Sequence, residues 1–225
     1  PGTPTAYNTG TWRIQKPQHV HQPAPCHNAC PAGEDAQAWL ALLDEGKPEQ
    51  AWLNLVSANP LPAITGRVCP HPCESACNRR AYDEAIAIHS VERYLGDQAI
   101  EHGWSYPTCA VTADAPTVAV VGAGPAGLSA AWQLRLHGIN VTVFDEMAEA
   151  GGTLFTIPDY RLPREVIRAE IGRLIDTGID YRPSHRLGRD IAIDELKSSF
   201  DAVFLAPGAQ LSSDWDIDGA TPADL

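Results

Sequence analysis

Five of the six cysteines lie close together in the first third of the chain, at spacings that could hold an inorganic cofactor. These five are Cys26, Cys30, Cys69, Cys73 and Cys77, while Cys109 stands apart and is assigned no role. Convergent thiolates are the ligands that zinc and iron–sulfur clusters prefer. If Cys73 and Cys77 belong to one helical turn, their side chains share a face. The spacing therefore predicts a metal-binding site.

The kind of metal site follows from the local pattern around these cysteines. Small secreted domains use such cysteines as disulfides, but a dinucleotide fold of the reducing cytosol favours metal binding. Structural zinc sites usually contain a C-x2-C knuckle, which this sequence lacks. The C-x3-C-P element at residues 26–31 is similar to the end of the bacterial ferredoxin run. We favour an iron–sulfur cluster, with zinc and unligated thiols as the alternatives.

A glycine-rich motif in the middle of the chain indicates a second kind of chemistry. Gly122, Gly124 and Gly127 form G-x-G-x-x-G directly after a β-branched apolar run at residues 118–121. The following residues, 125–137, have the composition of a helix that stops at a glycine. Such glycines let the backbone approach a pyrophosphate at the positively polarised N-terminus of a helix.

The residues after this helix complete a βαβ unit. A second apolar run at residues 139–144 ends at Asp145, 23 residues after Gly122. An acidic residue at this place typically binds a ribose hydroxyl of the dinucleotide. A lone glycine motif is often only a tight turn, but strand, helix, second strand and terminal acid together predict a dinucleotide site.

The cysteines must be positioned by the helices predicted around them. Apolar periodicity predicts helices at residues 33–46 and 48–59, the second opened by a proline. A third helix is expected from Ser90, as N-cap, to residue 102. Residues 61–80 are expected to form a loop whose end is helical. These elements predict an extended N-terminal arm over residues 1–25 and an all-helical domain over residues 26–103.

The glycine motif belongs to a region in which strands and helices alternate. Residues 104–116 have the composition of a linker. After the βαβ unit we expect a helix at residues 163–178, a short strand at 179–182, a helix at 191–200 and a buried strand at 202–205. Alternating strands and helices imply a parallel sheet. The fold class predicted is therefore α + α/β, with a Rossmann-like domain over residues 117–225.

Composition limits the possible partners. The formal charge of −12 argues against binding to nucleic acid or to an anionic membrane surface. The sequence has no run of 18 apolar residues and its N-terminus has no apolar core like that of a signal peptide. We expect a cytoplasmic protein without membrane insertion.

Seven motifs, in order along the chain, give a family resemblance. They are ACPAGED, NPLPAITGRVCPHPCESAC, IHSVERYLGD, GAGPAGLSAA, VTVFDE, GGTLFTIPDYRLP and FLAPGAQ. The chain resembles the small (beta) subunit of bacterial glutamate synthase. It is also similar to the N-terminal iron–sulfur and FAD region of dihydropyrimidine dehydrogenase and of the NADH-dependent ferredoxin:NADP oxidoreductase.

This resemblance implies that the glycine-motif domain is of the glutathione-reductase type and binds FAD. The pair Gly151-Gly152 after the βαβ unit is what favours FAD over NAD at this site. Asp145 would bind the adenosine ribose. The implied cofactor-binding residues are Gly122, Gly124, Pro125, Ala126, Gly127, Leu128, Asp145, Gly151, Gly152, Thr153, Arg161, Leu187, Ala206, Pro207 and Gly208.

The resemblance also implies iron–sulfur clusters in the helical domain. One [4Fe–4S] cluster of the family uses three cysteines and an acidic or amide side chain, which match Cys30, Cys69, Cys73 and Glu92. A second cluster uses four cysteines, of which only Cys26 and Cys77 are found here. His19 and His21 stand near the place of the missing upstream pair. We therefore expect one cluster and leave the second open.

The function implied is electron transfer within an NAD(P)H-linked oxidoreductase complex. The chain would pass electrons between NAD(P)H, flavin, cluster and a partner subunit. It ends where the family's NAD(P)H-binding domain begins, so we expect an incomplete FAD domain and NAD(P)H bound outside this sequence. Two alternatives are a docking subunit with a structural metal site and an NAD-binding dehydrogenase fragment with a zinc-stapled N-terminal domain. No side chain is assigned a catalytic role, because the cofactors perform the redox chemistry.

Overall fold

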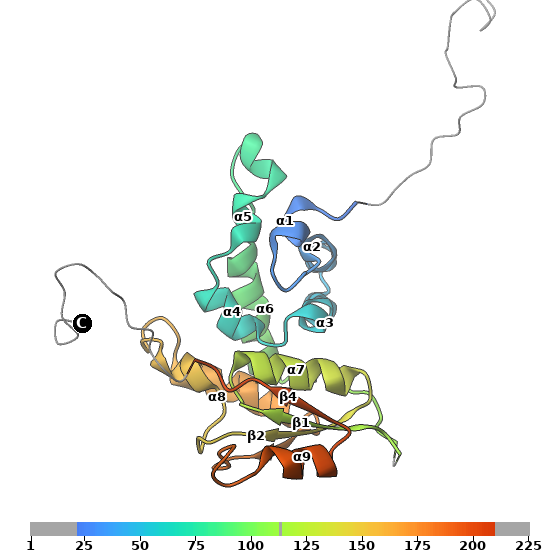
Figure 1. Ribbon diagram of the computed structural model, residues 1–225. Helices are drawn as coiled ribbons and strands as arrows, with labels where there is room; N and C mark the ends of the chain where they lie inside the picture. The colour runs from blue at the N-terminus through green and yellow to red at the C-terminus, as the bar shows by residue number, and fades with distance from the viewer. Residues whose placement is uncertain (1–21, 113, 210–225) are drawn as a thin grey trace, which may run out of the picture.

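The computed structural model of the protein describes residues 22–112 and 114–209. A group of helices precedes a domain built on a parallel sheet, and Figure 1 shows the helices standing on one side of that domain. Most of the predicted arm, with His19 and His21, lies outside the described residues, as do residues 210–225.

The N-terminal part is all-helical, as predicted. Its elements are α1 (Pro25–Ala29), α2 (Ala36–Asp44), α3 (Pro48–Ala58), α4 (Pro62–Val68), α5 (Pro72–Ser75), the 3-10 helix η2 (Asn78–Ala81) and α6 (Ile88–His102). Proline stands in the first turn of α1, α3, α4 and α5, where its fixed φ suits a helix and its missing N–H costs nothing. These prolines favour helix starts at defined positions, and several short helices follow one another within about 80 residues.

Two local predictions in this part are wrong. Residues 62–68, expected to lie in a loop, form α4, because their apolar side chains are buried against α6. Ser90 does not cap α6; the helix begins two residues earlier, after Ala87, and has no side-chain cap. The existence of α4 and the first residue of α6 both depend on tertiary packing, which the pattern of a single sequence does not show.

The C-terminal part contains one parallel sheet of order β3-β2-β1-β4. Its strands are β1 (Thr117–Val121), β2 (Asn140–Phe144), β3 (Asp180–Arg182) and β4 (Ala202–Leu205). Its helices are α7 (Pro125–Leu136), the 3-10 helix η3 (Gly152–Thr156), α8 (Arg164–Ile175) and α9 (Ile193–Ser199). The predicted βαβ unit is confirmed as β1, α7 and β2. The prediction that residues 202–205 are buried is wrong, because β4 is the edge strand and Phe204 and Leu205 are exposed.

Alternating residues of β1 pack into two different clusters. Val118 and Val120 face α7, α8 and the helical domain, whereas Ala119 and Val121 pack with Leu196 of α9. This alternation is the two-residue period of a strand buried on both faces. Figure 1 shows the resulting layers: the helical domain, then α7 and α8, then the sheet, then α9.

The two parts share one continuous core. Trp132 of α7 is fully buried, and its Nε1 donates a hydrogen bond of 2.8 Å to the carbonyl of Val56 in α3. Tyr106, in the segment between the parts, packs edge-on against both Trp52 and Trp132, and its hydroxyl donates to the carbonyl of Pro60. Residues 104–106 are thus packing elements rather than a free connection.

A buried carboxyl also joins the two parts. Glu170 of α8 is fully buried, and its two oxygens accept the backbone N–H groups of Ala63 and Ile64 at 2.7 and 2.9 Å. These groups belong to the first turn of α4, whose N–H groups have no partner within the helix. Burial raises the pKa of Glu170 to about 8, although both hydrogen bonds act to lower it. The helix that precedes Cys69 is therefore anchored by the dinucleotide domain.

Among residues 22–112 and 114–209, no helix is both long and apolar enough to cross a membrane.

Glu170→Gln should change how stability depends on pH. The ordinary pKa of 4.5 rises to about 8 on folding, so between these values the folded protein holds a proton that the unfolded chain has lost. The stability that this proton binding contributes is fully present below pH 4.5. It is lost as pH rises towards 8, by up to about 1.4 kcal/mol per pH unit. The wild-type unfolding free energy, minus that of Glu170→Gln, should therefore fall from about pH 5 to pH 8 in urea titrations.

The exposed Glu195 provides the matched control. In Glu195→Gln the same difference from wild type should stay constant over this range. A Glu170→Gln difference that is also constant with pH would contradict the shifted titration.

Candidate functional site

Three of the predicted metal-binding cysteines lie at the ends of short helices. Cys30 is the C-cap residue of α1, Cys69 is the C-cap residue of α4, and Cys73 lies within α5. The backbone N–H of His71 donates to Sγ of Cys69 at 3.2 Å. Helix α1 packs against α5, which brings residues from distant parts of the sequence to one place. All three cysteines are partly buried and free of disulfides.

Burial and neighbouring charges shift the pKa values of two of these thiols. Burial raises the pKa of Cys69, and the negative charges of Glu92 and Cys30 raise it further. The hydrogen bond from the His71 N–H acts in the opposite direction and lowers this pKa. Burial also raises the pKa of Cys73 to about 12, with contributions from the charges of Cys30 and Cys69. A cation bound among these thiols would favour their ionised forms.

Glu92 belongs to a buried polar network beside these cysteines. Its side chain is 5% exposed and accepts hydrogen bonds from Asn59 Nδ2 at 3.0 Å and from the hydroxyl of Thr65. Asn59 Nδ2 also donates to Glu34 at 2.8 Å. Burial and the charge of Glu34 raise the pKa of Glu92 to about 8. The predicted ligand Glu92 is therefore buried, and its charge acts on the Cys69 thiol.

Glu34 is a site residue that the sequence analysis missed. Its carboxyl is 6% exposed, and burial raises its pKa above the ordinary value. Its charge also acts on the Cys69 thiol. The one signal in the sequence was its position four residues after Cys30, and only the fold shows that this acid points inwards.

The remaining cysteines lie differently from these three. Helix α5 ends at Ser75, so Cys73 and Cys77 do not share one helical face as predicted; Cys77 instead precedes η2. The backbone N–H of Ile86 lowers the pKa of the Cys77 thiol. Cys26 lies in α1 and is partly buried. Cys109 is exposed and stands in the segment that joins the two parts.

The spacing of the thiols is wider than a zinc site requires. Tetrahedral zinc with bonds of about 2.3 Å needs sulfurs roughly 3.8 Å apart. Within the described part of the chain, no three ligand atoms that include a cysteine sulfur lie within 4.8 Å of one another. In this structure Cys30, Cys69 and Cys73 are therefore not spaced as the ligands of a single zinc ion.

The three motif glycines are required for different physical reasons. Gly122 has φ +105°, and a Cβ there would collide with the carbonyl of Ala206. A Cβ on Gly127 would collide with the carbonyl of Gly122. Gly124 differs, because its φ of −75° suits any residue and no protein atom lies within 4 Å of its missing Cβ. The open side of Gly124 is thus where a phosphate could approach the backbone.

The surroundings of Gly124 fit a dinucleotide. Gly124 is the N-cap of α7 and no side chain caps that helix, so its first N–H groups are available to an anion. The pair Gly151-Gly152 folds against the turn, with the Gly151 N–H donating to the Ala123 carbonyl at 2.8 Å. Asp145 accepts the N–H groups of Ala123 and Met147 at 2.5 and 2.7 Å. Each carboxylate oxygen can accept a second bond.

The other predicted cofactor-binding residues are distributed around this turn. Three of them are exposed near the turn: Pro125, Ala126 and Thr153. The N–H of Ala206 donates to the Val121 carbonyl at 2.7 Å, which places the 206–208 turn beside Gly122. The side chain of Leu128 is fully buried in the core.

Two residues lie elsewhere. Arg161 points to the helical domain and donates to the Val68 carbonyl at 3.4 Å. Leu187 packs on the α9 side of the sheet.

Comparison with known families matches both parts. Residues 20–104 match the family model described as dihydropyrimidine dehydrogenase domain II, 4Fe-4S cluster, and residues 120–186 match the NAD(P)-binding Rossmann-like domain. The small chain of glutamate synthase [NADPH] from Bacillus subtilis (strain 168) is 39% identical over 193 residues, covering 85% of this chain. The chain is a homologue of the glutamate synthase small chain. It consists of a helical 4Fe-4S domain followed by a Rossmann-like domain.

Two further relatives carry other names. The NADPH-Fe(3+) oxidoreductase subunit beta of Geobacter sulfurreducens is 39% identical over 95% of this chain. The NADP(+)-dependent formate dehydrogenase subunit beta of Moorella thermoacetica is 36% identical over 87% of it. The chain spans between 31% and 39% of the length of these three relatives.

Gly124→Ala should weaken dinucleotide binding without loss of stability. A methyl group fits the backbone and meets no protein atom, yet it occupies the side from which phosphates would approach. We expect the affinity for ADP, measured by calorimetry, to fall about tenfold or more, or ~1.4 kcal/mol.

Gly172→Ala in α8 is the control, because its missing Cβ also faces open space. It should leave ADP affinity unchanged and raise stability by about 0.5–1 kcal/mol. Wild-type ADP affinity in Gly124→Ala would show that the phosphates do not approach Gly124.

Proposed function

We propose that this chain is the FAD- and [4Fe–4S]-binding part of an NAD(P)H-linked oxidoreductase that passes electrons to a partner subunit. The observation that supports this most directly is the packing of the cysteine-bearing helices onto the dinucleotide domain through one core. Glu170 and the Tyr106–Trp132 contact hold the two sites in a fixed relation. Fixed geometry between two redox centres is what electron transfer through a protein requires.

One cluster would be held by Cys30, Cys69, Cys73 and Glu92. The first three lie in or at the ends of short helices, of which α1 and α5 pack together, and the charge of Glu92 in α6 acts on the Cys69 thiol. The His71 N–H already bonds to the Cys69 sulfur, and such bonds tune the potential of iron–sulfur centres. Cys26 and Cys77 supply only part of a second ligand set, so we propose a single cluster.

The dinucleotide would be FAD. The cradle fits the ADP half that FAD and NAD share: open N–H groups of α7, the free side of Gly124, and Asp145 for the ribose. The Gly151-Gly152 pair lies against that turn and leads into Thr153, where the chain would cover the flavin half. The chain's task here is to bind and orient the cofactor, and to offset the pyrophosphate charge.

The chemistry would come from the cofactors. When bound, a flavin and a cluster supply the conversion between two-electron hydride transfer and one-electron transfer. The residues of this chain position them, and the buried surroundings of Glu34 and Glu92 limit the access of water to the inner side of the cysteine site.

The lengths and names of the relatives support two further proposals. We propose that NAD(P)H binds to a further dinucleotide domain, since the relatives are two to three times longer than this chain. The beta-subunit and small-chain names of those relatives support a partner subunit. Free, partly buried thiols favour the reducing cytoplasm.

The two other readings of the sequence find less support. A zinc-stapled dehydrogenase fragment would need thiols closer together than these. A docking subunit with only a structural metal would have no use for the open cradle at Gly124.

Cys73→Ala should remove iron and leave the flavin. The cluster would lose one of its ligands, while the dinucleotide cradle lies in the other domain. We expect iron and acid-labile sulfide to fall to near zero per chain in anaerobically purified protein. Flavin absorption near ~450 nm should remain as in the wild type.

Cys109→Ala is the control, because this exposed cysteine is far from the site in sequence. It should keep iron, sulfide and flavin. Full iron content in Cys73→Ala would refute the ligand set, and a colourless wild type containing zinc would refute the proposed cofactors.

A further inference from the structure

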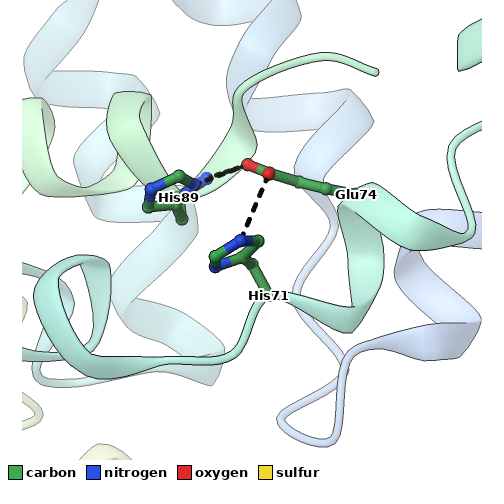
Figure 2. A group of neighbouring side chains, drawn as sticks. All are labelled: His71, Glu74 and His89. Atoms are coloured by element: carbon green, nitrogen blue, oxygen red, sulfur yellow. Dashed lines mark hydrogen bonds and ion pairs between the residues drawn. The ribbon is translucent and has the colours of Figure 1, made fainter. Parts of the chain in front are cut away.

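A second group of possible metal ligands lies beside the cysteine site and belongs to neither proposed cofactor. His71, Glu74 and His89 each offer a ligand atom, and these atoms lie within 4.8 Å of one another. Figure 2 shows the Glu74 carboxylate beside the two imidazole rings, with one oxygen directed towards each histidine. His71 precedes α5, Glu74 lies in α5, and His89 lies in the first turn of α6.

The hydrogen bonds of His71 direct a nitrogen lone pair towards Glu74. Its Nδ1 lies 3.0 Å from the carbonyl of Cys69, which can only accept, so Nδ1 carries the proton. In the neutral ring, Nε2 then bears a lone pair and faces Glu74 Oε2 at 3.6 Å. Two such atoms at 3.6 Å make no hydrogen bond, and a cation bound between them would be attracted by both. A backbone carbonyl that holds the other ring nitrogen is the usual arrangement around a metal-binding histidine.

Glu74 is held in place from the other side. Its Oε1 accepts the backbone N–H of His89 at 3.0 Å and lies 2.7 Å from Nδ1 of the same residue. The imidazoles of His71 and His89 stack with centroids 4.1 Å apart and planes 12° apart.

The backbone and the surface are also suited to a ligand site. His71 has φ +44°, a conformation that residues other than glycine rarely adopt and that the surrounding contacts must maintain. An open cavity of about 440 Å³ adjoins the group, lined by His71 and Glu74 and by polar residues that include Arg80, Asp83 and Glu84. Water and small molecules can therefore reach the Glu74 carboxylate.

We propose that His71, Glu74 and His89 bind a Zn²⁺-class divalent cation whose remaining coordination position opens to this cavity. Two imidazoles and one carboxylate are a ligand set that zinc uses with an open fourth position. Binding would displace the Nδ1 proton of His89 and turn the two rings out of their stack, so that both nitrogens face the ion. The ion would tie α5, which carries Cys73, to α6, which carries Glu92.

This inference does not rest on the flavin or the cluster, and zinc uptake by the cluster-loaded protein tests it. Calorimetry with Zn²⁺ should give one ion per chain. The zinc K-edge absorption spectrum should show a shell of nitrogen and oxygen at about 2.0–2.1 Å without sulfur at about 2.3 Å. Zinc should also raise the melting temperature, because it binds only the folded state.

Variants distinguish this group from the nearby thiols. Glu74→Gln and His89→Gln should each lower zinc affinity at least tenfold, with iron content and the circular dichroism spectrum unchanged. His102→Gln, at the exposed end of the same helix, should bind zinc as the wild type does. No zinc uptake by the wild type, sulfur in the zinc shell, or wild-type affinity in His89→Gln would each overturn the proposal.

Discussion

Buried acidic side chains beside the cysteines are the main electrostatic constraint on the helical domain. The charges of Glu92, Cys30 and Glu34 raise the pKa of Cys69, and the charge of Glu34 raises the pKa of Glu92. Asn59 donates to both carboxyls and offsets part of this repulsion. A cation bound among the thiols would offset more of it.

Helix α4 links this constraint to the dinucleotide domain. Its first turn is held by the Glu170 carboxyl of α8, and Cys69 ends it. A shift of α8 would therefore move a proposed cluster ligand. The aromatic contacts among Trp52, Tyr106 and Trp132 oppose such a shift, because they fill the space between α3 and α7. The two sites are parts of one packed body.

The sheet domain places its site by backbone geometry alone. Gly122 and Gly127 are needed for close packing within the protein, and Gly124 has no such need. What distinguishes Gly124 is its place at the uncapped N-terminus of α7, where a phosphate could approach the backbone. Asp145 supports the same turn through the Ala123 N–H, so the residue proposed to bind ribose also orders the phosphate loop.

The sequence by itself determined the βαβ unit, the helical class of the first domain and the cysteines, because apolar periodicity, glycine spacing and thiol chemistry are local properties. It missed α4, the exposure of β4, the end of α5 before Cys77 and the role of Glu34. It also assigned no role to His71, Glu74 and His89 as a group. Burial and contacts between residues far apart in sequence decide these features, and only the tertiary structure supplies both.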